Sequence, residues 1–316
     1  MNNPPASCPN LLSAGATEDT ATVESGAEFG APVIGEHASD KQSFPPSATL
    51  GVEDADRLMA TRYVTVIGIL GDPDAGKTAC LVSMYLLVAQ AQIGQLGFAD
   101  SRSLLAFEQI ARGARRWEGA AQQELTTRTL LSDERQAGFL HLRVVREDDR
   151  RRFDLLLPDL PGEWTTELVR TADAERLAFL RSADVVWLMI DGRALVDKVH
   201  RQGAIHRTQV LIERLAEVLG DLRPELVLVP TRHDLGVPPE ASTRAVARTA
   251  EERGFRFRIA PIASFADQGG PTAPGAGVAD LVAASLPVRP TGPVAPFWPD
   301  RPADSGRAFA QYRRSV

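Results

Sequence analysis

Apolar runs bounded by turn residues alternate along this chain with stretches in which apolar residues recur every three or four positions. The apolar runs predict strands at 63–70, 138–146, 152–158, 184–190, 225–230 and 257–262. The helical period predicts helices at about 78–91, 103–124, 173–182, 205–219, 241–253 and 277–286. Such alternation is typical of an α/β fold in which helices flank a sheet.

One short connection indicates that the sheet is mixed. The runs at 138–146 and 152–158 are separated only by a charged turn whose core is EDDR at 147–150. A connection of this length joins antiparallel strands, because a parallel crossover needs a dozen or more residues. We therefore expect six strands, mostly parallel, with an antiparallel hairpin between the second and the third.

The two ends of the chain differ from this pattern. Residues 1–60 contain Pro- and Ser-rich runs and an excess of acidic residues over Lys41 and Arg57, and residues 287–316 are Pro-rich. These compositions bury too little apolar surface to offset the entropy lost on folding, so we expect two disordered tails. The sequence predicts one domain at 61–286, with a helical insertion at about 97–125.

Composition argues against several classes of protein. The net charge is −6 without a dense basic stripe, which argues against nucleic-acid binding. Cys8 and Cys80 are too far apart to suggest a disulfide framework or a metal cluster, and a reducing cytoplasm fits them. No apolar run approaches the ~20 residues of a membrane span, and the N-terminus lacks a signal-peptide pattern. We expect a soluble, cytoplasmic protein.

The first strand runs directly into GDPDAGKT at 71–78, which fits the phosphate-binding pattern G-x-x-x-x-G-K-[ST] at every fixed position. In this motif the glycines let backbone N–H groups face phosphates, the lysine reaches the β- and γ-phosphates, and the hydroxyl binds Mg²⁺. A chance match is the alternative. The residues expected to bind nucleotide are Gly71, Asp72, Asp74, Ala75, Gly76, Lys77 and Thr78, with Lys77 also catalytic and Thr78 also a metal ligand.

A second motif follows the strand at 152–158, where Asp159 is followed three positions later by Gly162. An aspartate at the end of a strand beside a phosphate loop can hold Mg²⁺, and Gly162 can offer its backbone N–H to a γ-phosphate. Alone, D-x-x-G is also compatible with a simple turn that ends a strand. Its position downstream of a complete phosphate loop favours the functional interpretation.

The strand at 225–230 leads into TRHD at 231–234, and with this element the chain resembles the Ras-like GTPases among the P-loop proteins. The resemblance implies a three-layer P-loop NTPase sandwich that binds GTP or GDP with Mg²⁺. It aligns Thr231, Arg232 and Asp234 with the [NT]-K-x-D specificity motif, in which Asp234 accepts hydrogen bonds from guanine. Arg232 replaces the usual lysine, and its planar group can still cover the base. Ser264, in a fifth short element, would lie beside the guanine.

The resemblance also suggests switch residues. Within the wide gap between the first two motifs, TTRT at 126–129 is the switch I candidate. There one of the threonines, with Thr127 as the candidate, would complete the Mg²⁺ shell, and Arg128 would act as an internal arginine finger. Which of the threonines does so stays open. A polar loop with a surface arginine is the alternative. Glu163 stands where many Ras-like enzymes have glutamine, so it is the expected residue for orienting the attacking water.

Three features make the chain most similar to the bacterial double-GTPase domains of type 2: the wide gap, the D-L-P-G-E form of the second motif, and an R-T pair ahead of the second strand. This resemblance implies a GTP-binding switch with slow, Mg-dependent hydrolysis. The switch would act on effector or adaptor proteins through segments near 126–130 and 160–170, in a bacterial regulatory or conflict system. Two alternatives stay open: a P-loop ATPase or kinase, and a non-hydrolysing pseudo-GTPase scaffold.

Overall fold

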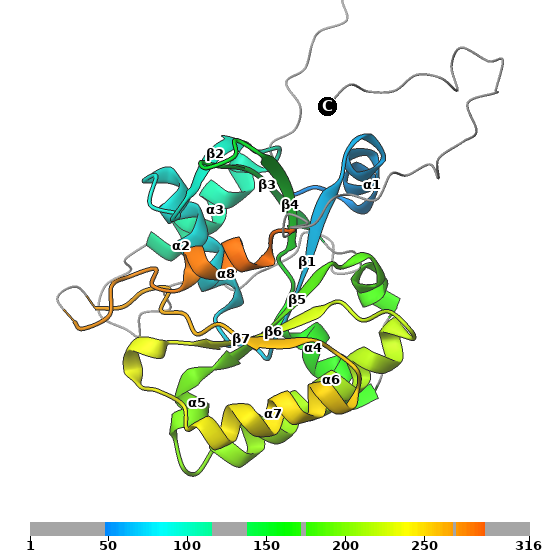
Figure 1. The fold of residues 1–316 in the computed structure, drawn as a ribbon, viewed down its shortest axis with the longest axis vertical. Coiled ribbons are helices and arrows are strands. Elements are labelled where there is room, and N and C mark those ends of the chain that lie inside the picture. Colours follow the sequence, from blue (N-terminus) through cyan, green and yellow to red (C-terminus); the bar gives the residue numbers. More distant parts are fainter. Residues whose placement is uncertain (1–47, 116–137, 172–174, 268–269, 288–316) are drawn as a thin grey trace, which may run out of the picture. The chain divides into compact units, whose positions relative to one another are not determined.

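The protein is described by a computed structural model that covers residues 48–115, 138–171, 175–267 and 270–287. These residues form one seven-stranded sheet in the order β2-β3-β4-β1-β5-β6-β7 (Figure 1). The strands are β1 (Val64–Leu70), β2 (Leu96–Asp100), β3 (Phe139–Arg146), β4 (Arg152–Pro158), β5 (Val185–Asp191), β6 (Glu225–Thr231) and β7 (Phe257–Ile259). Pairing is parallel from β4 through β7 and antiparallel at β2–β3 and β3–β4. The predicted mixed α/β sheet is confirmed.

Helices cover both faces of the sheet (Figure 1). They are α1 (Val52–Thr61), α2 (Lys77–Ala89), α3 (Leu104–Arg115), α4 (Gly162–Thr171), α5 (Gly192–Val196), α6 (Arg201–Leu219), α7 (Glu240–Glu252) and α8 (Val278–Ser285), with 3₁₀ turns η2 (Glu175–Ser182) and η3 (His233–Leu235). One core packs α1, α4, α6 and α7 against the sheet, and the other packs α2, α3 and α8. This is the three-layer arrangement expected for a P-loop NTPase.

The central strands are apolar almost throughout because both of their faces are covered. All seven residues of β1 (VTVIGIL) are buried, as are six of the seven in β5 (VVWLMID) and in β6 (ELVLVPT). Trp187 of β5 is fully buried, and its indole N–H donates to Ser285 Oγ of α8 at 2.9 Å. Because these strands are parallel, their carboxyl ends meet at one edge of the sheet, where ligands bind in open α/β folds.

The sheet has one strand more than the six that the sequence predicts. The additional strand, β2, is an edge strand that pairs antiparallel with β3 and falls in the region expected to form a helical insertion. Only Leu96 of its five residues is buried, and the strand is short and contains Gly97, a residue type that is depleted in strands, so its signal in the sequence is weak. Within that expected insertion α3 is helical, and residues 116–125 lie outside the described residues.

The described fold also begins earlier than the expected boundary at residue 60. Leu50 forms a backbone bridge with Phe139, with N···O distances of 2.8 and 2.9 Å. The helix α1 then places Ala55 and Leu58 in the core, where both are almost fully buried. Three of the ten residues of this helix are acidic, Glu53, Asp54 and Asp56, so its composition resembles that of the acidic segment before it.

Three further elements differ from the sequence prediction. The expected helix at 173–182 is the 3₁₀ turn η2, and the strand expected at 257–262 ends at Ile259. The helix α4 lies at Gly162–Thr171, where the sequence pattern predicts no helix. Within the described ranges, no helix has both the length and the apolar character that crossing a bilayer requires.

Candidate functional site

The loop that connects β1 to α2 requires both of its motif glycines. A Cβ on Gly71 would lie 2.5 Å from the carbonyl oxygen of Met189 in β5. Gly76 has a φ of 92°, in the left-handed region, and its added Cβ would lie 3.1 Å from Thr231 Cγ2. Ala75 is buried between them, and its N–H donates to the Asp72 carbonyl at 3.2 Å. The loop is therefore wrapped tightly against the ends of β5 and β6.

Lys77 begins α2 and closes this loop from inside. Its Nζ donates to the carbonyl oxygens of Gly71 at 2.8 Å and Asp72 at 2.9 Å, and the side chain is 7% exposed. Burial lowers the pKa of Lys77 from 10.5 to about 8, although Asp159 and neighbouring carboxylates oppose that shift. An ammonium in this position gains stabilisation when an anion approaches it.

The first two motifs meet beside Lys77. Thr78 Oγ1 donates to Asp159 Oδ1 at 3.4 Å, although 81 positions separate these residues in the sequence. Asp159 is buried directly after β4, which pairs in parallel with β1, so the two strands deliver the hydroxyl and the carboxylate to the same edge. The structure thus brings together the two described residues that the sequence predicts as metal ligands.

The helix α4 packs on the backbone of the phosphate loop. A Cβ on Gly162 would lie 2.4 Å from the nitrogen of Pro73, so only glycine permits this approach. Three residues later, the buried Thr165 accepts a hydrogen bond at its Oγ1 from the N–H of Gly71 at 3.2 Å. Glu163 lies in the first turn of α4, is exposed, and contributes to the electrostatic environment of Lys77.

The TRHD segment also contacts the phosphate loop. Thr231 is buried at the end of β6, and its hydroxyl donates to the Ile190 carbonyl at 3.2 Å. Arg232 has a φ of 52°, in the left-handed region, which is uncommon for a residue other than glycine. Its Nη1 donates to the Asp74 carbonyl at 3.0 Å. Asp234, in η3, is partly exposed.

Two buried polar atoms lie where the third motif meets the fifth element. His233 N–H donates to the Ile262 carbonyl at 3.0 Å, which places the TRHD segment beside the chain that leads to Ser264. Among the described residues, neither the Ser264 hydroxyl nor His233 Nδ1 has a hydrogen-bond partner, and both atoms are buried. Unsatisfied buried polar atoms are rare in native proteins, so both atoms are available to a further hydrogen-bonding group.

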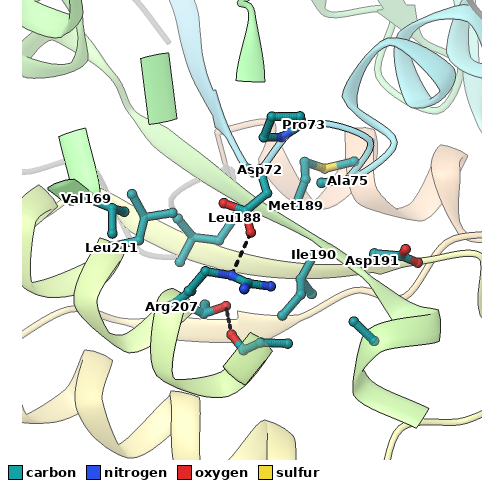
Figure 2. A pocket seen from close by; sticks show the side chains of 14 residues that line it. Asp72, Pro73, Ala75, Val169, Leu188, Met189, Ile190, Asp191, Arg207 and Leu211 are labelled. Carbon is teal, nitrogen blue, oxygen red and sulfur yellow. Dashed lines mark hydrogen bonds and ion pairs between the residues drawn. The ribbon is translucent and has the colours of Figure 1, made fainter. Parts of the chain in front are cut away.

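Sequence reasoning missed several residues of the site. Figure 2 shows a pocket below the phosphate loop in which Arg207 of α6 reaches Asp72, with a distance of 3.0 Å between Nε and Oδ2. Asp191, at the end of β5, lies 3.1 Å from Arg232 Nη1. Asp191 ends a parallel strand, and that position was a signal that it belongs to the site. Thr165 and Arg207 lie on helices, where nothing in the sequence distinguishes them.

The remaining predicted site residues, Thr127 and Arg128, lie outside the described residues, so their roles stay predictions. Every other predicted residue lies on the phosphate loop, on a segment that contacts it, or beside the TRHD segment.

A family model for the double-GTPase 2 domain matches residues 65–287, which include all of these motifs. The chain belongs to the double-GTPase 2 family. This double-GTPase domain is therefore a P-loop domain of the guanine-nucleotide-binding GTPase class. No curated protein matches the chain.

Among solved structures, two crystal structures of SsGBP mutation variants resemble this double-GTPase chain at 13% and 14% identity, each with a TM-score of 0.33. The matches cover 67% of this chain but only 55% and 54% of those chains, so this chain spans about half of their length. Likeness at this level carries no argument about function.

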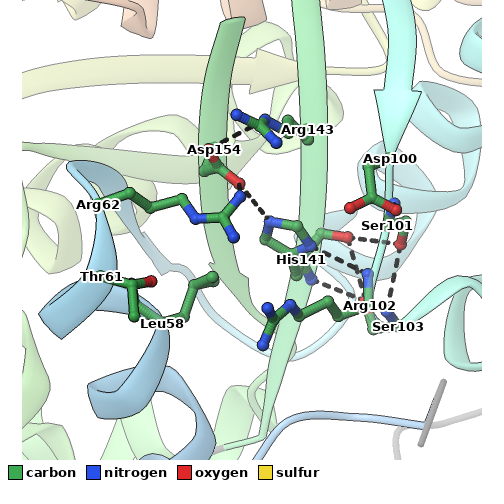
Figure 3. Close-up of polar contacts among 10 residues, drawn as sticks. All are labelled: Leu58, Thr61, Arg62, Asp100, Ser101, Arg102, Ser103, His141, Arg143 and Asp154. Atoms are coloured by element: carbon green, nitrogen blue, oxygen red, sulfur yellow. Dashed lines mark hydrogen bonds and ion pairs between the residues drawn. The ribbon is translucent and has the colours of Figure 1, made fainter. Parts of the chain in front are cut away.

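A separate polar cluster lies away from this site, in the middle of β3 and β4 (Figure 3). His141 is fully buried, and its Nε2 lies 3.0 Å from Asp154 Oδ1. Its Nδ1 accepts the N–H of Arg102 at 3.0 Å, which assigns the ring proton to Nε2. Burial lowers the pKa of His141. Arg62 at 3.4 Å and Arg143 at 3.3 Å complete the cluster around Asp154, which ties α1, β3 and β4 together.

Proposed function

We propose that this double-GTPase domain is a molecular switch that binds GTP or GDP with Mg²⁺ and hydrolyses GTP slowly. The observation that carries the proposal is that the D-x-x-G motif after β4 and the TRHD motif at the end of β6 both contact the phosphate loop after β1. Thr78 contacts Asp159, Gly162 packs on Pro73, and Arg232 donates to the carbonyl of Asp74. An isolated phosphate-loop match would not place the other two motifs there.

The phosphate loop supplies the recognition of the phosphates. Backbone N–H groups at the start of α2 form an anion site, because a helix N-terminus carries unsatisfied donors and the positive end of the helix dipole. Lys77 adds a partly desolvated positive charge, whose interaction with a phosphate is stronger than it would be in water. In the proposal the backbone N–H groups at the start of α2 and the Lys77 ammonium bind the β- and γ-phosphates.

The residues present fit Mg²⁺. Thr78 and Asp159 offer a hydroxyl and a carboxylate oxygen, which are the hard donors that Mg²⁺ prefers. Mg²⁺ usually takes few protein ligands, because phosphate oxygens and water fill its other coordination positions. Thr127 is the further ligand predicted from the sequence. When bound, Mg²⁺ would neutralise charge on the phosphates.

Guanine is the proposed base. Asp234 would accept hydrogen bonds from the N1–H and the exocyclic amine of guanine, a pair of donors that adenine does not present. Arg232 would lie over the base while it stays bonded to the phosphate loop. In the proposal the unsatisfied Ser264 hydroxyl and His233 Nδ1 are polar groups beside the bound guanine.

Glu163 is the proposed residue for hydrolysis. It lies one position after Gly162, in the first turn of a helix that packs on the phosphate loop. Phosphoryl transfer depends mainly on positioning and on charge stabilisation, so a side chain that orients the attacking water contributes without forming a bond. A carboxylate near phosphate charge is less suited to this task than an amide, which is the reason for proposing slow turnover. Arg128 is the proposed internal arginine finger.

In the proposal α4 is the reporting element of the switch. The helix α4 begins at Gly162, which would donate its N–H to the γ-phosphate, and the same helix buries Trp164 and Leu168 in the core. A change at Gly162 is thereby transmitted to packed side chains. An effector or adaptor protein of a bacterial regulatory or conflict system, in the cytoplasm, is the proposed partner.

Binding is tested by calorimetric titration of GTP with Mg²⁺. We expect Lys77→Ala to weaken binding at least ~tenfold, because a charge-assisted hydrogen bond contributes about 1.5–3 kcal/mol. Lys198→Ala is the matched control, since Lys198 is an exposed lysine on the loop after α5. Thr78→Ala should retain GTP with less dependence on Mg²⁺. Equal affinity of wild type and Lys77→Ala would refute the phosphate site.

Hydrolysis is tested separately by single-turnover assays of wild type and Glu163→Ala. We expect slow turnover in the wild type and slower turnover in the variant, with GTP affinity nearly preserved. Equal rates would remove Glu163 from the mechanism. Binding without turnover in either protein would favour the pseudo-GTPase scaffold.

A further inference from the structure

The end of β5 carries Asp191-Gly192-Arg193, a segment that none of the GTPase motifs includes. Asp191 Oδ1 lies 3.1 Å from Arg232 Nη1, and the same nitrogen donates to the Asp74 carbonyl at 3.0 Å. One guanidinium nitrogen therefore joins the carboxylate at the end of β5 to the phosphate loop. Figure 2 shows Asp191 at the side of the pocket nearest α5.

The carboxylate of Asp191 is itself held in place. Arg193 donates from Nε to both carboxylate oxygens, at 3.2 and 3.0 Å, and from Nη2 to Oδ2 at 2.9 Å. The backbone N–H of Arg193 also donates to Oδ1 at 3.0 Å, so Asp191 is the N-cap of α5. Burial alone would raise the pKa of Asp191, but the hydrogen bond from Arg193 and the charge of Arg232 lower it overall. The group is therefore an anion near neutral pH.

Glycine at position 192 allows this arrangement. A Cβ there would lie 2.1 Å from the carbonyl oxygen of Thr231, so any other residue would push the ends of β5 and β6 apart. The close approach places Asp191 beside Arg232, the residue that follows Thr231. Gly192 thus permits the short distance between Asp191 and Arg232. Arg193, through its hydrogen bonds, holds the negatively charged carboxylate of Asp191 in place.

An arginine at position 232 needs an anionic partner such as Asp191 more than a lysine at that position would. A lysine ammonium is a compact charge with rotating donors, and it can follow a single carbonyl acceptor. A guanidinium is planar, and its donors point in fixed directions, so its orientation decides whether it reaches the carbonyl. A second, anionic acceptor fixes that orientation.

We propose that Asp191 is a positioning residue for the nucleotide: it orients Arg232 so that the base-binding segment stays attached to the phosphate loop. This inference rests on the proposed binding of GTP. It predicts that the importance of Asp191 depends on arginine at position 232. It also predicts that Asp191→Asn, which keeps an acceptor of the same shape, loses less affinity than Asp191→Ala.

The test is a double-mutant cycle in which the Kd for GTP with Mg²⁺ is measured by calorimetry. We expect Asp191→Ala to weaken binding about tenfold, a loss of about 1.4 kcal/mol, in the wild-type background. In the Arg232→Lys background the same substitution should change the Kd less than about twofold. Thermal unfolding of each variant reports the loss of the α5 N-cap separately, because that loss does not depend on position 232.

Asp197→Ala is the matched control, since Asp197 is the other acid at a terminus of α5 and has no contact with Arg232 among the described residues. It should leave the Kd unchanged. Equal losses from Asp191→Ala in both backgrounds would show a structural role and overturn the inference, as would unchanged affinity in the wild-type background. A wild type that binds no guanine nucleotide would overturn the proposed function and this inference together, which distinguishes the two failures.

Discussion

Lys77 should make the free domain less stable at neutral pH than at alkaline pH. Its pKa is lowered from 10.5 to about 8, first of all by burial. Below about pH 8 the folded and unfolded states both hold the proton; between about pH 8 and about 10.5 the unfolded state binds more protons. The free energy of unfolding should therefore rise with pH in this window. One pKa unit corresponds to about 1.4 kcal/mol, so the full rise is about 3 kcal/mol.

Lys77→Met isolates this contribution, because it removes the titrating group and keeps an unbranched side chain at the start of α2. Urea denaturation at about pH 7.5 and about pH 10 should show the wild type gaining about 2 kcal/mol more than Lys77→Met between these conditions. Other titrating groups are common to both proteins and cancel in the comparison. Lys198→Met, at an exposed position, should behave as the wild type does. Parallel pH profiles for wild type and Lys77→Met would refute the reasoning.

Three further outcomes follow from the packing of Leu58 and Gly162 and from the lowered pKa of His141. Leu58→Ala should destabilise the domain by about 2–5 kcal/mol in urea denaturation, because Leu58 is 1% exposed in the core; a loss below about 0.5 kcal/mol would contradict the assignment of α1 to the fold. Gly162→Ala should displace α4 from Pro73 and weaken GTP binding in calorimetry, whereas an unchanged Kd would show that α4 moves freely. Because the pKa of His141 is lowered by burial, acidification below its unfolded pKa of about 6.5 should destabilise the wild type more than His141→Gln; equal slopes against pH would contradict this.

The sequence predicts the meeting of the strand-end motifs better than it predicts the edges of the fold. The phosphate loop has fixed residues at fixed spacing. Asp159 directly follows β4, a parallel neighbour of β1, and Thr231 ends β6, a parallel neighbour of β5. Carboxyl ends of such strands meet at one edge, so the meeting of the motifs follows from the order of the elements. The antiparallel pairing of β3 and β4 follows in the same way from their short connection.

Other features depend on information that periodicity does not contain. In β2 only Leu96 is buried, so its position depends on pairing with β3 rather than on a buried face. In α1 the core contacts of Ala55 and Leu58 are surrounded by acidic residues. The contact between Asp191 and Arg232 joins two strand ends through side-chain directions, which become definite only once β5 and β6 are paired.

The most direct test of the account is a competition measurement of base selectivity. A fluorescent guanine nucleotide bound to the wild type with Mg²⁺ is displaced by GTP or by ATP, and the same titrations are repeated with Asp234→Ala. We predict displacement by GTP at far lower concentrations than by ATP in the wild type. We also predict loss of that selectivity in the variant, because Asp234 is the group that would pair with the guanine donors. Displacement by ATP at concentrations equal to or below those of GTP would contradict the account and favour a P-loop ATPase or kinase.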